Sequence, residues 1–410
     1  MVNARRSVAV SLLLVLVATV TGAADWPQYR GPNRDGRSSE TGLLGSWPEA
    51  GPQELWRVPV GSGYSGMAVV DGIVFTMFGA GGDEIAGAFD STSGSELWRF
   101  NMGGNMRSNQ GDGPRATPTV DGNLVFFLGA RSKLYALDTH TGEMRWGVDL
   151  PRELGSKVPE WGSSSSPLVE GQLLIVDVAG KKDHGIVAFD KTSGKIVWNA
   201  GNHRPAYSSP IAVTLAGERQ FVVFTAEGLR GVSAQNGDRL WSSPWTTDWD
   251  VNAATPIFVP RSGIFVSSGY NTGAALLQIV KEDGDYRVYE VWRNRLMKNH
   301  FNSSVLVGGF LYGFDMGTLK CLDALTGEEK WRARSGFSKG SLLYADGHLI
   351  VMGGSGSLGL VKATPEGYRL ESRVEVLEGK TWTMPSLADG IVYVRDFEEM
   401  VALRVAEVKN

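Results

Sequence analysis

Residues with the chemistry to bind a ligand or partner gather in six long segments: 101–116, 149–164, 199–209, 242–255, 293–304 and 378–384. Aromatic and arginine side chains often dominate the binding free energy of such surfaces. We therefore expect a binding face, and its candidate residues are Arg107, Arg115, Trp161, His203, Arg204, Tyr207, Trp245, Trp249, Asp250, Asn252, Lys298, His300, Asn302 and Trp382.

Motifs for catalysis are absent from the sequence. Residues 61–66 and 354–359 both read GxGxxG, but each precedes an expected strand, so neither offers a helix N-terminus to a pyrophosphate. The nucleophile-elbow pattern GxSxG, the zinc-protease pattern HExxH, the phosphate-binding Walker pattern and the haem-attachment pattern CxxCH do not occur. We assign no catalytic residue.

The sequence also predicts no metal site. Of the five widely separated histidines, only His203 and His300 fall on the candidate face, and neither has a nearby carboxylate in sequence. Asp248, Asp250 and Asn252 alternate like the start of a calcium loop, but alanine and valine replace the glycine and glutamate that an EF-hand needs at positions six and twelve. A calcium site completed by other loops stays open, although hydrogen bonding is the preferred use of these side chains.

A repeated motif indicates the elements that position these segments. An Asp, a Thr-Gly or Ser-Gly turn and a Trp recur at fixed spacing in AFDSTSGSELW (88–98), ALDTHTGEMRW (136–146), AFDKTSGKIVW (188–198) and CLDALTGEEKW (321–331). Short turns, most of them Asp-Gly or Gly-Gly, recur with spacings of 50, 49, 46, 46, 46, 38 and 43 residues. Four strands in about 45 residues, repeated radially, are typical of a propeller blade.

The repeats therefore predict an all-β fold, an eight-bladed β-propeller of four-stranded antiparallel blades. The chain ends after the third strand of the last blade, while residues 54–58 carry a fourth-strand Trp with no blade of their own. We expect this N-terminal strand to complete the C-terminal blade and so remove two exposed sheet edges. Tryptophans 56, 98, 146, 198, 241, 292 and 331 are then structural, buried between blades.

The six long segments would join the fourth strand of one blade to the first strand of the next, on one face of the ring. They could bind a partner there, or they could simply fill the channel and satisfy one another's hydrogen bonds.

Composition and targeting signals limit the function further. The 410 residues carry a net charge of −4, which gives no electrostatic footprint for nucleic acid. Residues 1–24 have the features of a signal peptide for the general secretory route, so we expect cleavage near Ala24 and a periplasmic or secreted protein. The expected organisation is an extension over 25–52 and the propeller over 53–410. Cys321 stands alone, which excludes an intrachain disulfide and gives no lipid-anchor cysteine.

The repeat resembles that of the PQQ-like (quinoprotein-type) propeller superfamily. That superfamily includes quinoprotein dehydrogenases and the propeller lipoprotein of the outer-membrane β-barrel assembly machine. The leader DWPQYRGPNRDG (25–36) resembles that of small exported PQQ-binding-like repeat proteins. The resemblance implies the fold, and it implies either an enzyme or a scaffold. Its enzymes hold the quinone PQQ between a Trp and a pair of adjacent cysteines, with calcium and an Asp base, and this chain has no cysteine pair.

The preferred function is therefore an exported, non-catalytic module that binds a protein partner or small ligand through the loops at one channel mouth. The alternative is a PQQ-dependent, calcium-containing dehydrogenase acting on alcohols or sugars, with Trp249 or Trp382 as the stacking surface and Asp248 or Asp250 as base. An enzyme of another kind also stays open. We expect a monomer with no nucleic-acid partner and no stable membrane anchor.

Overall fold

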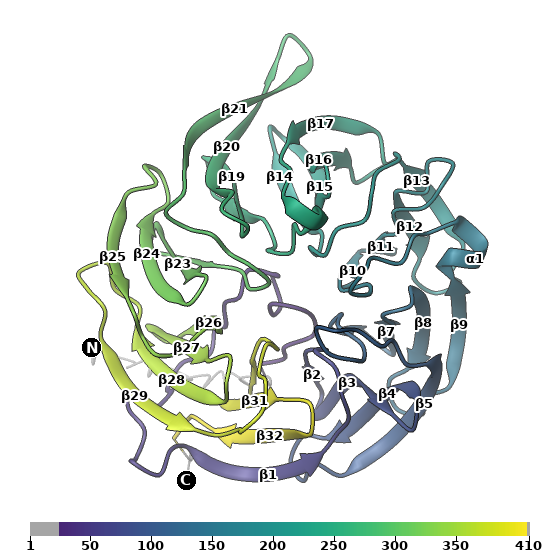
Figure 1. Cartoon of the computed structure of the whole chain (residues 1–410). Helices are drawn as coiled ribbons and strands as arrows, with labels where there is room; N and C mark the ends of the chain where they lie inside the picture. Colours follow the sequence, from purple (N-terminus) through teal and green to yellow (C-terminus); the bar gives the residue numbers. More distant parts are fainter. Residues whose placement is uncertain (1–23, 408–410) are drawn as a thin grey trace, which may run out of the picture.

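The computed structural model describes residues 24–407 as eight four-stranded antiparallel sheets set radially around a central channel (Figure 1). This confirms the predicted eight-bladed propeller. The only helical elements in this described range are α1 (Leu150–Leu154) and the 3-10 turn η1 (Asp248–Asp250). The predicted signal peptide, except for Ala24, lies outside the described residues.

The first four blades follow one another along the chain. Blade 1 contains β2 (Ala68–Val70), β3 (Ile73–Ala80), β4 (Asp83–Asp90) and β5 (Glu96–Gly104). Blade 2 contains β6 (Thr119–Asp121), β7 (Leu124–Leu128), β8 (Lys133–Asp138) and β9 (Met144–Asp149). Blade 3 contains β10 (Leu168–Glu170), β11 (Leu173–Asp177), β12 (Ile186–Asp190) and β13 (Ile196–Ala200). Blade 4 contains β14 (Ile211–Leu215), β15 (Glu218–Thr225), β16 (Gly228–Ser233) and β17 (Arg239–Pro244).

The last four blades complete the ring. Blade 5 contains β18 (Ile257–Val259), β19 (Gly263–Ser268), β20 (Gly273–Glu282) and β21 (Asp285–Asn294). Blade 6 contains β22 (Val305–Val307), β23 (Phe310–Asp315), β24 (Thr318–Asp323) and β25 (Glu329–Ala333). Blade 7 contains β26 (Ser341–Ala345), β27 (His348–Met352), β28 (Ser357–Lys362) and β29 (Leu370–Glu375). Blade 8 contains β30 (Ser386–Ala388), β31 (Ile391–Arg395), β32 (Glu399–Arg404) and β1 (Gln53–Pro59).

Strand β1 closes the ring as the sequence predicts. It pairs antiparallel with β32, with Trp56 opposite Ala402, and so supplies the outer strand of the last blade. The N-terminal and C-terminal parts of the propeller are thereby joined in one sheet, and the inner strands of blades 1 and 8 lie in contact. The closure leaves no unpaired edge on β32.

The repeated Trp and Gly have one joint explanation. The indole of Trp98 in blade 1 lies against Gly142 in the turn of blade 2, and a Cβ at Gly142 would lie 2.7 Å from the ring. Trp98 Nε1 also donates to the carbonyl oxygen of Thr139 in that turn at 2.9 Å. The same Trp-on-Gly contact occurs in the pairs Trp56 with Gly94, Trp146 with Gly194, Trp198 with Gly237 and Trp292 with Gly327.

The motif Asp shapes the turn that receives the indole. Asp138 Oδ1 accepts hydrogen bonds from the backbone N–H groups of His140 and Thr141, both at 3.0 Å. Gly142 follows with φ at +70°, a conformation that costs glycine nothing. Asp, Gly and Trp therefore form one interlocking device between successive blades.

A second contact between blades lines the channel, at a Thr-Pro or Ser-Pro pair before the innermost strand. The backbone N–H of Thr117 donates to Ser166 Oγ, and that of Ser166 donates to Ser209 Oγ, both at 2.9 Å. Each hydroxyl thus satisfies a backbone donor of the preceding blade. The sequence carries this repeat at 117–118, 166–167, 209–210 and 255–256.

The N-terminal segment closes one mouth of the channel, on the face that carries the first hairpin turn of each blade (Figure 1). Arg30 and Arg34 are almost fully buried there. Arg30 donates to the carbonyl oxygen of Ser304 at 2.7 Å, and Arg34 donates to that of Ser166 at 2.8 Å. These bonds tie the segment to blade 6 and to blade 3. The long loops therefore surround the other mouth.

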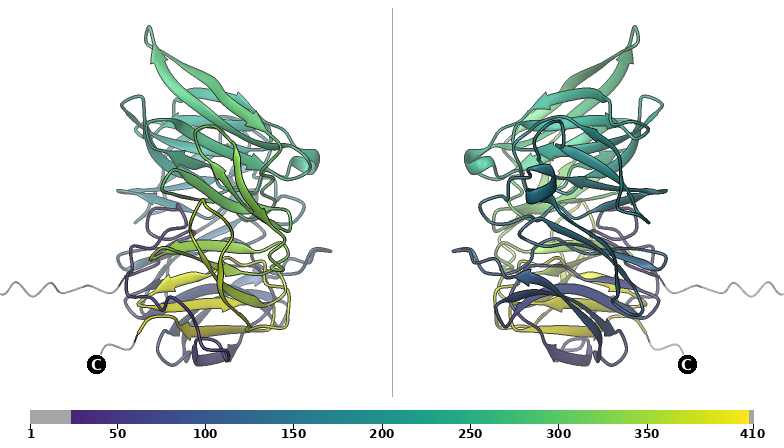
Figure 2. Two further views of the ribbon diagram at one scale, coloured as in Figure 1. Left: turned by 90° about the vertical axis from the view of Figure 1, so that its left-hand side faces the viewer. Right: turned by 90° about the vertical axis from the view of Figure 1, so that its right-hand side faces the viewer.

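Blade 5 departs from the repeat. Its β20–β21 hairpin lacks the Thr-Gly turn and projects beyond the outline of the ring (Figure 2). Trp241 of blade 4 consequently has no such turn to contact, and its Nε1 donates instead to Gln220 Oε1 within its own blade, at 2.7 Å. The loss of one motif copy thus changes the contact made by the preceding blade.

Replacing a motif Trp should be costly, because its ring fills the space between two blades. Trp146 is 9% exposed and also contacts Phe189 of the next blade. We expect Trp146→Ala to lower the free energy of unfolding by about 3–5 kcal/mol in a urea titration. Met144→Ala, two residues away in β9 and 53% exposed, should change it by less than about 0.5 kcal/mol. Equal effects of the two substitutions would contradict the inter-blade role of the indole.

Candidate binding site at one mouth of the channel

A cavity of about 510 Å³ lies within the mouth that the long loops surround. Tyr29 of the N-terminal segment contributes to its lining, so the segment that closes the opposite mouth also reaches this space. We call it the axial cavity. Six of the fourteen candidate residues line it: Arg115, Trp161, Tyr207, His300, Asn302 and Trp382.

A row of aromatic rings in contact with one another forms part of the cavity wall. Tyr64 and Trp382 stack at 5.7 Å between ring centroids, and Trp382 and Phe301 stack at 4.7 Å. The row continues from Phe301 to His300 and from His300 to Tyr270, at 5.6 and 5.1 Å. We call these five residues the aromatic row. It joins the loops that precede blades 1, 6 and 8 to a turn within blade 5.

Trp161 and Tyr207 form a second aromatic pair, with ring centroids 5.7 Å apart. Burial raises the pKa of Tyr207 to about 12, and burial likewise raises the pKa of Tyr64 to about 12, so both phenols stay neutral at physiological pH. The cavity therefore has broad aromatic surfaces in which the tyrosines carry no charge.

The charged groups that line the cavity are cationic. Arg115 lies over the Tyr64 ring, with 5.4 Å between the guanidinium carbon and the ring centroid, and Lys339 lines the cavity too. Burial, together with the charge of Lys339, lowers the pKa of His300 to about 4, so this imidazole is neutral near pH 7. No Asp or Glu of the described chain belongs to the lining.

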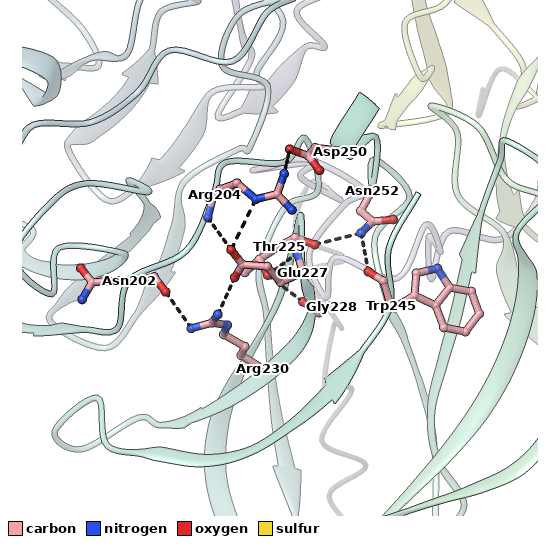
Figure 3. Close-up of polar contacts among 9 residues, drawn as sticks. All are labelled: Asn202, Arg204, Thr225, Glu227, Gly228, Arg230, Trp245, Asp250 and Asn252. Atoms are coloured by element: carbon pink, nitrogen blue, oxygen red, sulfur yellow. Dashed lines mark hydrogen bonds and ion pairs between the residues drawn. The ribbon is translucent and has the colours of Figure 1, made fainter. Parts of the chain in front are cut away.

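Ion pairs fix two of the long loops to each other (Figure 3). The guanidinium of Arg204 pairs with Asp250, and the backbone N–H of Arg204 donates to Glu227 at 3.1 Å. Arg230 donates to the other oxygen of Glu227 at 2.6 Å. Beside them, Asn252 is fully buried and donates to the carbonyl oxygens of Thr225 and Trp245. Loop 242–255 is thus held from both sides.

This anchored loop presents Trp249 to solvent. The side chain is 72% exposed, and Trp249 and Asp250 both have positive φ values, at +63° and +58°. Consecutive non-glycine residues in this conformation are costly unless their surroundings hold them in place, and such strain is enriched at functional sites. The ion pair of Asp250 with Arg204 supplies one such restraint.

Other candidate residues serve contacts within the protein. His203 and Asp177 form a buried pair, with 2.7 Å between His203 Nε2 and Asp177 Oδ1. Trp245 is buried and donates to Ser268 Oγ, at 3.1 Å. The remaining two lie outside the axial cavity: Lys298 pairs with Asp315, and Arg107 lines a separate hollow beside Arg131 and Lys133.

The sequence argument did not select three members of the aromatic row, Tyr64, Phe301 and Tyr270. Phe301 lies between His300 and Asn302, two residues that it did select. Tyr64 precedes the first hairpin and Tyr270 lies in a turn within blade 5, so neither falls in the long segments. The sequence argument could have used a second signal to find Tyr64 and Tyr270, because both residues lie in glycine-containing stretches that reach the channel.

The cavity does not suit calcium, which is the cation expected for the quinone enzymes whose repeat this chain resembles. Calcium takes six to eight oxygen ligands, several of them carboxylates, and no Asp or Glu of the described chain lines the cavity. The described residues also contain no group of three or more His, Cys, Asp or Glu suited to a metal ion. Across the same residues, no helix is long and apolar enough to cross a membrane.

The depressed pKa of His300 predicts how stability changes with pH. As the pH falls from 6.5 toward 4, the unfolded chain gains a proton at this position that the folded chain does not, so the free energy of unfolding should fall. His300→Gln should remove up to about 3 kcal/mol of that fall. Urea titrations between pH 7 and 4 measure it. An NMR titration of the imidazole that gives a pKa above 6 would contradict the prediction.

Comparison of this sequence with known proteins identifies the family to which the chain belongs. A family model described as "Outer membrane protein assembly factor BamB" matches residues 81–315. The quinoprotein alcohol dehydrogenase PedH of Pseudomonas putida is 25% identical over 190 residues, which cover 44% of this chain and 29% of PedH. Outer membrane protein assembly factor BamB of Burkholderia pseudomallei is 24% identical over 218 residues, which cover 52% of this chain and 51% of that protein. The chain thus spans about half or less of the length of these relatives.

Two solved structures share the fold. BamB from Moraxella catarrhalis aligns with a TM-score of 0.59 and 16% identity, covering 87% of this chain and 100% of that one. Quinohemoprotein alcohol dehydrogenase from Comamonas testosteroni aligns with a TM-score of 0.65 and 11% identity, covering 94% of this chain and 81% of that one. Because the family model covers more than half of the sequence, this protein belongs to the PQQ-type propeller family of outer membrane protein assembly factor BamB.

Proposed function

We propose that this protein is an exported, non-catalytic binding or scaffolding module that captures a protein partner or small ligand at the loop-lined channel mouth. The observation that carries the proposal is the axial cavity, which combines broad aromatic surfaces with Arg115 and Lys339 and has no carboxylate among its described lining residues. Concave aromatic sites with a few polar groups are the usual form of a ligand site.

The surface around the cavity supports the same proposal. Trp249 projects beside the mouth on a loop that Arg204 and Asp250 hold in place. A large exposed aromatic side chain on an ordered backbone loses little conformational entropy on binding, which favours it as an anchor. Partner capture at this face agrees with membership in a family described by an assembly factor.

A quinone-dependent oxidoreductase acting on alcohols or sugars is the second candidate, favoured by the similarity to PedH. The donor set of the cavity counts against it, because calcium would find no carboxylate ligand there. Location in the periplasm or outside the cell, a monomeric state, and the absence of nucleic-acid and membrane contacts are also parts of the proposal.

Photo-crosslinking tests where a partner binds. The photoreactive residue p-benzoylphenylalanine replaces Trp249 at the loop face or Leu325, which is 54% exposed in a blade turn on the opposite face. In living cells of the source organism, the Trp249 variant should form a defined adduct that the Leu325 variant does not, because binding anchors concentrate at the loop face. Adducts at position 325 alone would contradict the proposed face.

A dye-reduction assay separates the two candidate functions. Purified protein with PQQ, calcium, an electron-accepting dye and ethanol or glucose should not reduce the dye above a protein-free control, since no carboxylate of the described residues lines the cavity to bind calcium. Substrate-dependent dye reduction that is lost in Asp250→Asn would establish the enzyme and reject the scaffold proposal.

A further inference from the structure

A second hollow, with a volume of about 540 Å³, lies on the loop face between blades 1 and 2. It is lined by the loop that follows β5, by the β7–β8 turn with the start of β8, and by the loop that follows β9. Of the described residues that line it, none also lines the axial cavity. We call it the lateral hollow. It contains Arg107, a residue that the sequence argument selected for binding.

The lateral hollow is lined by three cations and one carboxylate, which are Arg107, Arg131, Lys133 and Asp149. Within the described chain, none of the three cations forms an ion pair with an Asp or Glu. Asp149 is opposite Lys133 in the strand register, but its carboxylate caps α1 and accepts from the backbone N–H of Arg152 at 3.1 Å. A protein with a net charge of −4 therefore has a local excess of positive charge here.

Arg131 reaches from blade 2 to blade 1 and keeps free donors. Its Nε donates to the carbonyl oxygen of Gly104 at 3.0 Å, and one terminal nitrogen donates to that of Asn105 at 3.1 Å. These two bonds fix the plane of the guanidinium. Since a guanidinium has five N–H donors, three have no acceptor among the described residues. A carboxylate can accept two of them together.

The nearby carboxylate of Glu84 is used within the protein. Its side chain is 3% exposed, and it accepts from the backbone N–H of Ala130 at 3.0 Å. Burial raises the pKa of Glu84, which disfavours the charged form that could balance Arg131. Arg131 itself is exposed and lines the hollow, so its charge is available to a ligand there.

The ammonium group of Lys133 lies beside the end of β5, where Gly103 leaves room for it. A Cβ at Gly103 would lie 3.2 Å from Lys133 Nζ, and Gly103 has φ at +99°. Glycine adopts this backbone conformation readily, whereas other residues rarely do. The end of β5 thus brings the Lys133 ammonium and the Arg131 guanidinium to the same hollow.

Apolar side chains share the hollow with the cations. Met106, Pro151 and Val158 line it, and Val158 is 39% exposed. A simple inorganic anion would contact only the cations and leave these apolar surfaces in water. A peptide segment with both carboxylates and an apolar side chain would contact both kinds of surface. The volume of 540 Å³ also falls in the range of sites that hold a ligand of many atoms.

We propose that the lateral hollow binds an acidic, extended segment of a partner protein. Carboxylates of the segment contact Arg131, Lys133 and Arg107, and an apolar side chain of the segment packs against Val158. This rests on the proposed function and names the chemistry of the partner. Complementary charge speeds the encounter with an acidic segment and disfavours a basic one.

Fluorescence anisotropy with rhodamine-labelled peptides tests the proposal on the purified protein. A peptide of Asp-Leu-Glu repeats should bind saturably, and a matched peptide of Asn-Leu-Gln repeats should bind about tenfold more weakly, because an amide lacks the charge of a carboxylate. Asp-Ser-Glu repeats, which keep the acids and lose the apolar side chains, should bind about threefold more weakly. Equal binding of the acidic and amide peptides, or full displacement of the acidic peptide by an equal concentration of inorganic phosphate, would overturn the proposal.

Matched variants locate the site. Arg131→Gln and Lys133→Gln should each weaken binding of the acidic peptide about tenfold and leave binding of the amide peptide unchanged. Arg287→Gln, which removes an exposed arginine of β21, should leave both unchanged. If Arg131→Gln melts at a lower temperature than the native protein, Lys133→Gln decides, because its ammonium has no ion-pair partner to lose. Normal binding of the acidic peptide by Lys133→Gln would refute the assignment.

The outcome is separable from that of the proposed function. Specific adducts at position 249, together with equal binding of the acidic and amide peptides, would reject the acidic segment and keep the partner-binding face. Binding of the acidic peptide that Lys133→Gln weakens, without any adduct at position 249, would support the lateral hollow and reject capture at the channel mouth.

Discussion

The fold depends on one recurring contact, which joins five of the eight pairs of neighbouring blades: the indole of one blade lies on a glycine in the turn of the next blade. A side chain at that glycine would collide with the ring, as Gly142 and Trp98 show. The contact buries a large aromatic surface, and in the Trp98 copy the carbonyl oxygen of Thr139 also accepts a hydrogen bond from the indole N–H. The ring closes because β1 completes blade 8 against β32, which places Trp56 on Gly94 in the turn of blade 1.

The function that we propose follows from how the ring treats its two mouths. On one face, buried Arg30 and Arg34 tie the N-terminal segment to backbone carbonyls of distant blades. The contacts on that face stabilise the fold. On the other face, the loops between blades leave a cavity whose cations have no lining carboxylate to neutralise them. A propeller with one closed mouth and one open, charged mouth is suited to binding from a single side.

The sequence predicted the fold well because the repeat is a local signal. Asp138, Gly142 and Trp146 act within ten residues, and their spacing survives in several copies. The binding site was harder to predict, because its residues come from different blades. Residue type alone does not distinguish a side chain that holds a loop in place from one that contacts a ligand. Asn252 and His203 have the chemistry of a site, but they bond to backbone and to Asp177. Tyr64 and Tyr270 reach the cavity from outside the long loops, which no local pattern shows.

A crystallographic fragment screen tests the central claim, that the axial cavity is the binding site. Crystals soaked with a chemically mixed library of acids, bases and neutral compounds would give an unbiased map of the surface. We expect aromatic fragments to accumulate in the axial cavity, against the rings of its wall. Aromatic fragments that bind only elsewhere on the surface would contradict the claim.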